Sequence, residues 1–209
     1  MVNNKLIVID GLIGAGKSTL IEAIKNKINN DNVLFVSEPI DKYMEYKQFS
    51  PLKLAYENPK NWSITQLHII NCLTNTFSEI NKKNKDKIII SERGLFSPLI
   101  FSNVTNELNY MTDFELCFII DYLYDKINIL NLPITGLFYI DISIDKALER
   151  IKIRNREGED KITETYLKTL DKHYKLYLSK HEYDFPIKIV KYNDPKLIDK
   201  LVNFLNHVT

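Results

Sequence analysis

Residues 11–18, which read GLIGAGKS, constrain the fold of this 209-residue chain more than any other segment. They match G-x-x-x-x-G-K-[ST], follow a short apolar run and precede a helical pattern. In that context the backbone N–H groups and the helix N-terminus bind nucleotide phosphates, the lysine contacts the terminal phosphates, and the serine ligates Mg²⁺. The candidate phosphate-binding residues are Gly11, Leu12, Ile13, Gly14, Ala15, Gly16, Lys17, Ser18 and Thr19.

Short apolar segments alternate with helical patterns along the chain. This alternation predicts an α/β fold of the three-layer P-loop NTPase type, with a mostly parallel sheet of about five strands flanked by helices. We find no repeat or linker, so we expect one domain over residues 1–209. Strands are predicted at 5–10, 33–37, 87–91, 135–141 and 187–192, and helices at 17–29, 62–83, 113–130, 144–154, 163–178 and 195–205.

The composition argues against several classes of protein. Lys and Arg total 28 and Asp and Glu total 27, so the basic excess of a nucleic-acid-binding protein is missing. No apolar run is long enough to span a bilayer, and the first strand begins too close to Met1 to leave room for a leader. The only cysteines, Cys72 and Cys117, do not make a disulfide framework. We therefore expect a cytoplasmic protein (host cytoplasm if viral) without nucleic-acid or membrane partners.

Charged residues follow two of the predicted strands, at the edge where ligands of such sheets bind. Glu38 could accept the proton of a substrate hydroxyl that attacks the γ-phosphate, or it could be a solvated residue in a turn. Glu92 and Arg93 could place a carboxylate near Mg²⁺ and a guanidinium on the acceptor oxygen, or they could form a structural ion pair. We find no N-K-x-D-like element of the kind that GTPases use to read guanine.

Three arginines cluster late in the chain. Arg150 and Arg154 lie one helical turn apart on the same face, and Arg156 continues into a loop. Such a cluster suits a lid, at about residues 154–161, that closes over a transferring phosphoryl group. The alternative is a solvated, charged helix end.

Together these motifs resemble the deoxynucleoside kinase family, which includes deoxycytidine, deoxyguanosine and mitochondrial-type thymidine kinases. The resemblance covers most of the chain and is most specific at residues 56–62 (YENPKNW) and 150–167. Enzymes of this family phosphorylate the 5′-hydroxyl of deoxynucleosides with ATP or another nucleoside triphosphate. The resemblance implies the same reaction here, with Mg²⁺ and in a homodimer.

The resemblance also implies roles for single residues. Glu38 matches the general base, Arg93 the arginine that holds this base and the reacting oxygen, and Ser18 with Glu92 the Mg²⁺ positions. Tyr56 and Glu159 match a pair that binds the sugar 3′-hydroxyl, and Tyr43 matches an aromatic residue of the acceptor pocket. On the donor side, Arg150, Arg154 and Arg156 match the lid arginines, with Arg150 stacking on the donor base, and Asp194 matches a residue beside that base.

Several positions depart from the family pattern. The family has serine where this chain has Gly94, and deoxycytidine-type members have a base-reading aspartate where it has Pro98. An apolar residue there leaves room for the thymine methyl group, so we expect a pyrimidine preference, with thymidine favoured over deoxycytidine. The glutamine that pairs with the base should stand at position 67, but this chain has Gln66 followed by Leu67. His68 is a second candidate for the pocket, or a core or surface histidine.

Two other functions compete with this interpretation. A thymidylate-type kinase has the same loop and lid, but it must bind an acceptor phosphate, which a carboxylate at Glu38 would repel. A non-catalytic scaffold built on this fold could lose Lys17, Ser18, Glu38 or Arg93 without penalty, and all four are present.

Overall fold

The computed structural model describes residues 4–28, 30–179 and 183–208. Its sheet has five strands in the order β2-β3-β1-β4-β5, and every neighbouring pair is parallel. The strands are β1 (Lys5–Gly11), β2 (Val33–Val36), β3 (Ile88–Glu92), β4 (Ile134–Asp141) and β5 (Ile187–Lys191). The predicted α/β fold with a five-stranded parallel sheet is thereby confirmed.

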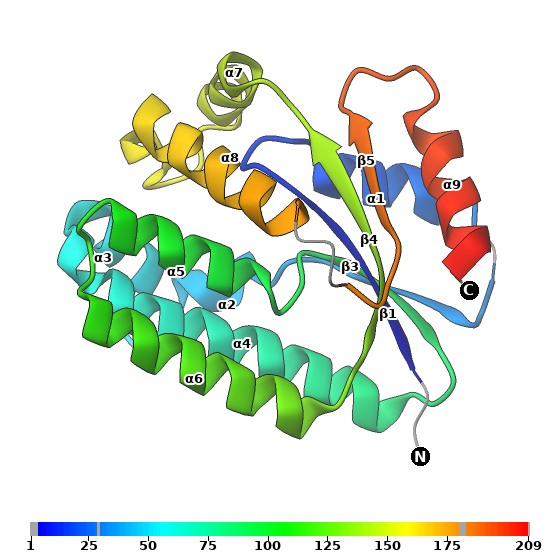
Figure 1. Cartoon of the computed structure of the whole chain (residues 1–209), viewed down its shortest axis with the longest axis horizontal. Coiled ribbons are helices and arrows are strands. Elements are labelled where there is room, and N and C mark those ends of the chain that lie inside the picture. The colour runs from blue at the N-terminus through cyan, green and yellow to red at the C-terminus, as the bar shows by residue number, and fades with distance from the viewer. Residues whose placement is uncertain (1–3, 29, 180–182, 209) are drawn as a thin grey trace.

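Helices cover both faces of the sheet (Figure 1). Helices α1 and α9 contact each other on one face, while α4, α5, α6 and α8 form a contacting group on the other. The helices are α1 (Lys17–Lys25), α2 (Ile40–Met44), α3 (Pro51–Glu57), α4 (Trp62–Lys83), α5 (Ser97–Glu107), α6 (Asp113–Leu130), α7 (Ile144–Arg154), α8 (Glu164–Leu178) and α9 (Leu197–Val208), with short 3₁₀ turns η1 (Pro59–Asn61) and η2 (Glu159–Lys161).

The central strands β1 and β4 form the middle of the hydrophobic core. Leu6, Ile7, Val8 and Ile9 are 0% exposed, as expected for a parallel strand buried on both faces. On α1 the apolar positions Leu20, Ile21 and Ile24 are all buried, which follows from their helical spacing. Because all strands point the same way, the loops after their carboxyl ends meet at one edge of the sheet.

Local signals place several helix ends where the sequence predicts them. The Thr112 hydroxyl accepts a hydrogen bond from the Glu115 backbone N–H, and the Glu115 carboxylate accepts one from the Thr112 N–H. This capping box starts α6. Among the described helices, none is long and apolar enough to cross a membrane.

Other boundaries were predicted wrongly, and three helices were missed. Helix α1 ends at Lys25 and does not continue through Ile28, and position 29, the end of that prediction, lies outside the described residues. Helix α9 begins two residues later than position 195, because Asp194 forms a turn that accepts the Lys196 and Leu197 N–H groups. Helices α2, α3 and α5 are short or rich in Ser, Pro and Asn, so they lack a clear periodic signal.

Candidate active site

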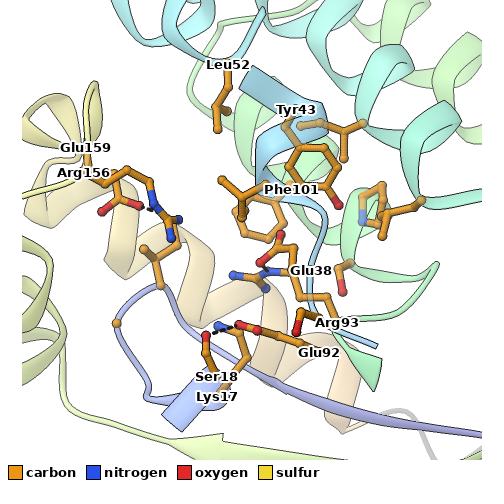
Figure 2. Close-up of a pocket in the computed structure, with 18 of the residues that line it drawn as sticks. Lys17, Ser18, Glu38, Tyr43, Leu52, Glu92, Arg93, Phe101, Arg156 and Glu159 are labelled. Carbon is orange, nitrogen blue, oxygen red and sulfur yellow. Dashed lines mark hydrogen bonds and ion pairs between the residues drawn. The ribbon is translucent and has the colours of Figure 1, made fainter. Parts of the chain in front are cut away.

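Two cavities meet at the carboxyl edge of the sheet, one of about 320 Å³ and one of about 570 Å³. Gly14, Lys17, Ser18 and Glu92 line both, together with Arg154 and Arg156. The smaller cavity, called here the acceptor pocket, extends towards α2, α3 and α4 (Figure 2). The larger, called the donor pocket, extends over α1 towards α7 and α9. Two adjoining cavities that share a phosphate-binding loop can hold two substrates end to end.

The loop between β1 and α1 has the conformation that its glycines permit. Gly14 and Gly16 have φ values of 82° and 93°, in the region that favours glycine. The Lys17 ammonium donates to the carbonyl oxygens of Gly11 at 3.3 Å and Leu12 at 3.0 Å. Burial lowers the pKa of Lys17 to about 8, and the nearby Arg93 charge acts in the same direction. A phosphate group would offer this buried cation better partners than carbonyl oxygens.

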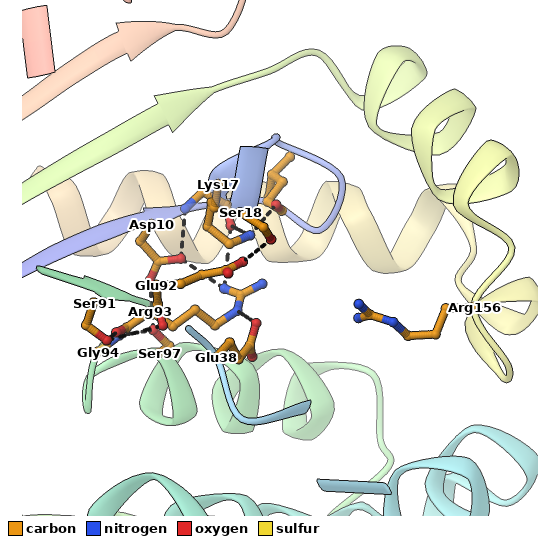
Figure 3. Close-up of polar contacts among 12 residues, drawn as sticks. Asp10, Lys17, Ser18, Glu38, Ser91, Glu92, Arg93, Gly94, Ser97 and Arg156 are labelled. Atoms are coloured by element: carbon orange, nitrogen blue, oxygen red, sulfur yellow. Dashed lines mark hydrogen bonds and ion pairs between the residues drawn. The ribbon is translucent and has the colours of Figure 1, made fainter. Parts of the chain in front are cut away.

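Glu38 and Arg93 form a mostly buried ion pair that lines the acceptor pocket, beside Lys17 and Glu92, which line both cavities (Figure 3). Arg93 Nε donates to Glu38 Oε2 at 3.0 Å. Burial raises the pKa of Glu38 above its ordinary value, against the opposing effect of Arg93 and Lys17. Within the described part of the chain, Arg93 Nη2 has no hydrogen-bond partner. The pair therefore presents a basic carboxylate and a free N–H donor to the acceptor pocket.

Ser18 and Glu92 contact each other beside the phosphate-binding loop. The Ser18 hydroxyl donates to Glu92 Oε1 at 2.9 Å. A hydroxyl and a carboxylate oxygen fit Mg²⁺, which prefers oxygen ligands and takes only one or two from the protein when it also binds phosphates. Among the described residues there is no cluster of three His, Cys, Asp or Glu side chains that could hold a metal by itself.

Asp10 is a buried part of the site that the sequence analysis missed. Its Oδ1 accepts a hydrogen bond from Arg93 Nη1 at 2.9 Å, and its Oδ2 accepts one from Ser97 Oγ at 2.7 Å. A charged residue as the last member of a buried strand before residues 11–18 was a usable signal, because such a charge needs a partner.

The far wall of the acceptor pocket combines apolar side chains with two unpartnered polar atoms. Gln66 Oε1 and the Tyr43 hydroxyl are buried without hydrogen-bond partners in the described structure. Buried polar groups are normally paired, so both atoms are candidates for ligand contacts. Leu52, Pro98 and Phe101 supply the apolar part of this wall (Figure 2).

Gln66, and not position 67, faces the pocket. Trp62, Gln66, Ile69 and Leu73 line it together, at the spacing of one helix face of α4. Leu67 lies on the adjoining face and lines a separate groove. The one-residue offset from the family pattern therefore does not move the amide out of the pocket.

Tyr56 and the loop that carries Gly158 and Glu159 meet although they are distant in sequence. Both Tyr56 and Glu159 line the acceptor pocket, and a Cβ atom on Gly158 would lie 2.8 Å from Tyr56 Cδ2. Burial raises the pKa of the Tyr56 phenol, and the Glu159 charge adds to this effect. The phenol thus stays protonated and can donate a hydrogen bond beside a carboxylate.

The three arginines predicted to belong to a lid take different positions. Arg154 binds Glu159 through Nε and Nη2 at 2.6–3.0 Å, and Arg156 Nη1 lies 3.3 Å from Glu159 Oε1. Arg150 instead lies in the donor pocket, where Nη1 donates to the Ala15 carbonyl at 3.1 Å. Its guanidinium carbon is 4.8 Å from the centre of the Tyr192 ring, a residue that the sequence analysis missed.

Two candidate residues and one departure from the pattern have local explanations. Asp194 pairs with Lys200 at the start of α9 and is not among the residues that line the donor pocket. His68 Nε2 contacts the Lys42 carbonyl oxygen at 2.8 Å and lines the separate groove, not the acceptor pocket. At Gly94 a side chain has no room, since a Cβ would lie 2.8 Å from Val8 Cγ2.

Comparison with known proteins agrees with this geometry. The family model described as deoxynucleoside kinase matches residues 7–207. A fowlpox virus protein described as a probable deoxycytidine kinase is 32% identical over 200 residues, covering 94% of this chain and 82% of its own. Deoxyadenosine kinase of Dictyostelium discoideum is 25% identical over 200 residues, covering 94% and 77%.

Solved structures give the same result. Deoxyadenosine kinase from M. mycoides with its products dCMP and dCDP bound superposes with a TM-score of 0.81 at 27% identity, covering 97% of this chain and 100% of that chain. The same enzyme with dATP bound gives a TM-score of 0.78 at 28% identity, covering 96% and 99%.

Proposed function

Because the chain belongs to the deoxynucleoside kinase family, we propose that it transfers the γ-phosphoryl group of ATP to the 5′-hydroxyl of a deoxynucleoside. The observation that carries this proposal is the Glu38–Arg93 pair, which lines the acceptor pocket next to Lys17 and Glu92, two residues that line both pockets. Glu38 accepts the proton of the 5′-hydroxyl as its oxygen attacks, and Arg93 Nη2 donates to that oxygen. Positioning and electrostatics supply most of the rate enhancement, because phosphoryl transfer requires little covalent chemistry from the protein.

The donor half of the site neutralises and aligns the triphosphate. Lys17 and backbone N–H groups from residues 12–19 hold the phosphates, since the Gly11 N–H already donates to Asp10 Oδ1. Mg²⁺, held by Ser18 and Glu92, supplies further positive charge to the phosphate oxygens when it is bound. Arg154 and Arg156 bring charge from the lid, while Arg150 lies in the donor pocket, where it can contact the donor base.

The acceptor half recognises a sugar and a base. Tyr56 and Glu159 bind the 3′-hydroxyl, one as donor and the other as acceptor. Tyr43 closes the pocket at the sugar. Gln66 pairs with the base edge through its amide, whose oxygen has no partner within the described structure.

For the base we propose a pyrimidine preference, with thymidine favoured and deoxycytidine accepted. Pro98 is the supporting residue, since it is apolar and lines the acceptor pocket. The named relatives are described as a probable deoxycytidine kinase and a deoxyadenosine kinase, so these two nucleosides are the competing substrates. An amide such as Gln66 can present donor and acceptor in either order and does not by itself discriminate between them.

We also propose a homodimer that forms through α4 and α6. Large apolar side chains on these two helices are exposed, with Ile64 at 65%, Phe114 at 80% and Phe118 at 55%. Contiguous exposed apolar surface of this kind marks a protein–protein interface. Light scattering of the wild type and of Phe118→Asp tests this proposal. A dimeric wild type and a monomeric variant would support it, and a monomeric wild type would contradict it.

A panel of acceptors tests the proposed function. Purified chain is incubated with ATP and Mg²⁺ and with each of the four deoxynucleosides and the four matching monophosphates, and products are separated by chromatography. We expect deoxynucleoside 5′-monophosphates, with thymidine used best. Exclusive use of monophosphates would establish a thymidylate-type kinase instead, and no turnover of any acceptor would favour the scaffold.

A further inference from the structure

Asp10 lies at the centre of a buried hydrogen-bond network, and its side chain is 0% exposed (Figure 3). Oδ1 accepts from Arg93 Nη1 at 2.9 Å, from the Tyr174 hydroxyl at 3.0 Å and from the Gly11 N–H at 2.7 Å. Oδ2 accepts from Ser97 Oγ at 2.7 Å. A carboxylate with four donors around it is held in a single orientation.

Tyr174 of α8 links Asp10 to Arg93. Its hydroxyl accepts a hydrogen bond from Arg93 Nη1 at 2.8 Å and donates one to Asp10 Oδ1. Burial raises the pKa of this phenol well above its ordinary value, so it stays protonated and keeps donating. The three groups thus form a closed triangle of charge-assisted hydrogen bonds.

These contacts, with two others, fix Arg93 from several directions. The Phe101 ring centre lies 4.8 Å from its guanidinium carbon. The Arg93 backbone has a φ of 63°, a conformation that costs energy in a residue other than glycine. The Ser91 hydroxyl donates a hydrogen bond to the Arg93 carbonyl oxygen at 2.8 Å. The Arg93 guanidinium is thus held from several sides, and Glu38 Oε2 accepts a hydrogen bond from its Nε.

We propose that Asp10 is a positioning residue for phosphoryl transfer: with Tyr174 it fixes the Arg93 guanidinium, which in turn holds Glu38 beside the phosphate-binding loop. This inference rests on the proposed function, since it assigns Asp10 a part in the same reaction. Asp10 is absent from the described residues that line either cavity. Its loss should therefore slow the chemical step and leave the binding of both substrates nearly unchanged.

The fold provides a matched control for Tyr174. Tyr139 of β4 is also buried, and its ring centre lies 5.2 Å from that of Tyr174. Its hydroxyl has no hydrogen-bond partner among the described residues. Tyr139→Phe thus removes the same atom from the same region without breaking the network.

Steady-state kinetics of Asp10→Asn, Tyr174→Phe and Tyr139→Phe test the proposal. Asn keeps the shape of Asp and removes its charge. We expect kcat to fall about tenfold or more in Asp10→Asn and by a smaller factor in Tyr174→Phe, with both KM values within about twofold and Tyr139→Phe unaffected. If Asp10→Asn and Tyr174→Phe turn over as fast as Tyr139→Phe, the proposal is wrong. Should Asp10→Asn not fold, the two tyrosine variants decide.

A double-mutant cycle separates positioning from a general structural role. If Asp10 acts through Arg93 on Glu38, Asp10→Asn should cost much less in a Glu38→Gln background than in the wild type. An equal loss of kcat in both backgrounds would show that Asp10 only supports the fold.

A substrate-free measurement distinguishes failure of this inference from failure of the proposed function. In resting protein labelled with ¹⁵N-arginine, the Arg93 Nε–H should exchange slowly with water in wild type and Tyr139→Phe. We expect exchange about tenfold faster or more in Asp10→Asn and Tyr174→Phe, because the guanidinium is then freer to move. Equal exchange in all four proteins would refute the inference, whereas a wild type that phosphorylates no deoxynucleoside would refute only the function.

Discussion

Arg93 Nε donates a hydrogen bond to Glu38 Oε2 at 3.0 Å, joining the loop after β2 to the end of the neighbouring strand β3. The contact turns two residues that are distant in sequence into one unit in the wall of the acceptor pocket. A carboxylate in this position can act as a base only while it is deprotonated. The pair therefore connects the geometry of the site to the pH at which it works.

The pH profile should report both buried charges. Burial raises the pKa of Glu38, so kcat/KM for the deoxynucleoside should fall with acidification at a pH above the ordinary glutamate value of 4.5. Because the Lys17 pKa is lowered to about 8, kcat/KM for ATP should fall as the pH rises through that value. An acidic limb that persists in Glu38→Gln would show that another group is titrating.

Tyr56→Phe should weaken the binding of the deoxynucleoside more than the binding of ATP. The variant keeps the ring that packs on Gly158 and loses only the hydroxyl near Glu159. We expect KM for the deoxynucleoside to rise about tenfold, the value of one hydrogen bond to a buried polar partner, with KM for ATP unchanged. Tyr124→Phe, on the exposed face of α6, is the control. The reverse ranking of the two KM values would contradict the assignment to the sugar.

Pro98→Asp should move the preference from thymidine towards deoxycytidine. Pro98 lies in the first turn of α5, where an aspartate is compatible with the helix. The new carboxylate can accept from the cytosine amino group and repels the thymine carbonyl, so the deoxycytidine/thymidine ratio of kcat/KM should rise about tenfold or more. Pro98→Ala, which adds no charge, should leave this ratio near the wild-type value. An unchanged ratio in Pro98→Asp would place the base elsewhere.

Gly158→Ala should disturb both stability and the acceptor pocket. Gly158 has a φ of 83°, and a Cβ would lie 2.8 Å from Tyr56 Cδ2. We expect a loss of about 1–2 kcal/mol of stability, from strain in the left-handed region, and a higher KM for the deoxynucleoside. Asp160→Ala, an exposed change in the same loop, should affect neither. Normal melting and a normal KM in Gly158→Ala would mean that the loop and Tyr56 are not in contact.

The sheet and the phosphate-binding loop were predictable from the sequence for physical reasons. Parallel strands that are buried on both faces appear in the sequence as continuous apolar runs. The glycine spacing of residues 11–18 has few explanations other than a phosphate-binding loop. Helix α8 likewise carries an amphipathic pattern, and α4 and α6 are long enough to be recognised as helices. Helices α2 and α3, which form one wall of the acceptor pocket, are too short to show such a pattern.

The site was predicted in outline but not in its internal contacts. Candidate residues such as Glu38 and Arg93 could be placed at strand ends from the sequence, and the structure brings these two into contact. The role proposed for Asp10 rests on its hydrogen bond with Tyr174, and nothing in the local sequence of either residue indicates the other. The pairing of Arg150 with Tyr192 was hidden for the same reason. The orientation of Gln66 depends on which face of α4 lines the acceptor pocket. Only the three-dimensional structure shows that this is the face shared by Trp62 and Gln66.

Single-turnover transfer by Glu38→Gln tests the central claim most directly. Gln keeps the shape of Glu and can still accept from Arg93, but it cannot take a proton from a hydroxyl. With the best deoxynucleoside and saturating ATP and Mg²⁺, we predict a rate about 10²–10⁴-fold below wild type, with the binding of both substrates retained. A wild-type rate in this variant would contradict the account, because Glu38 would then not be the base.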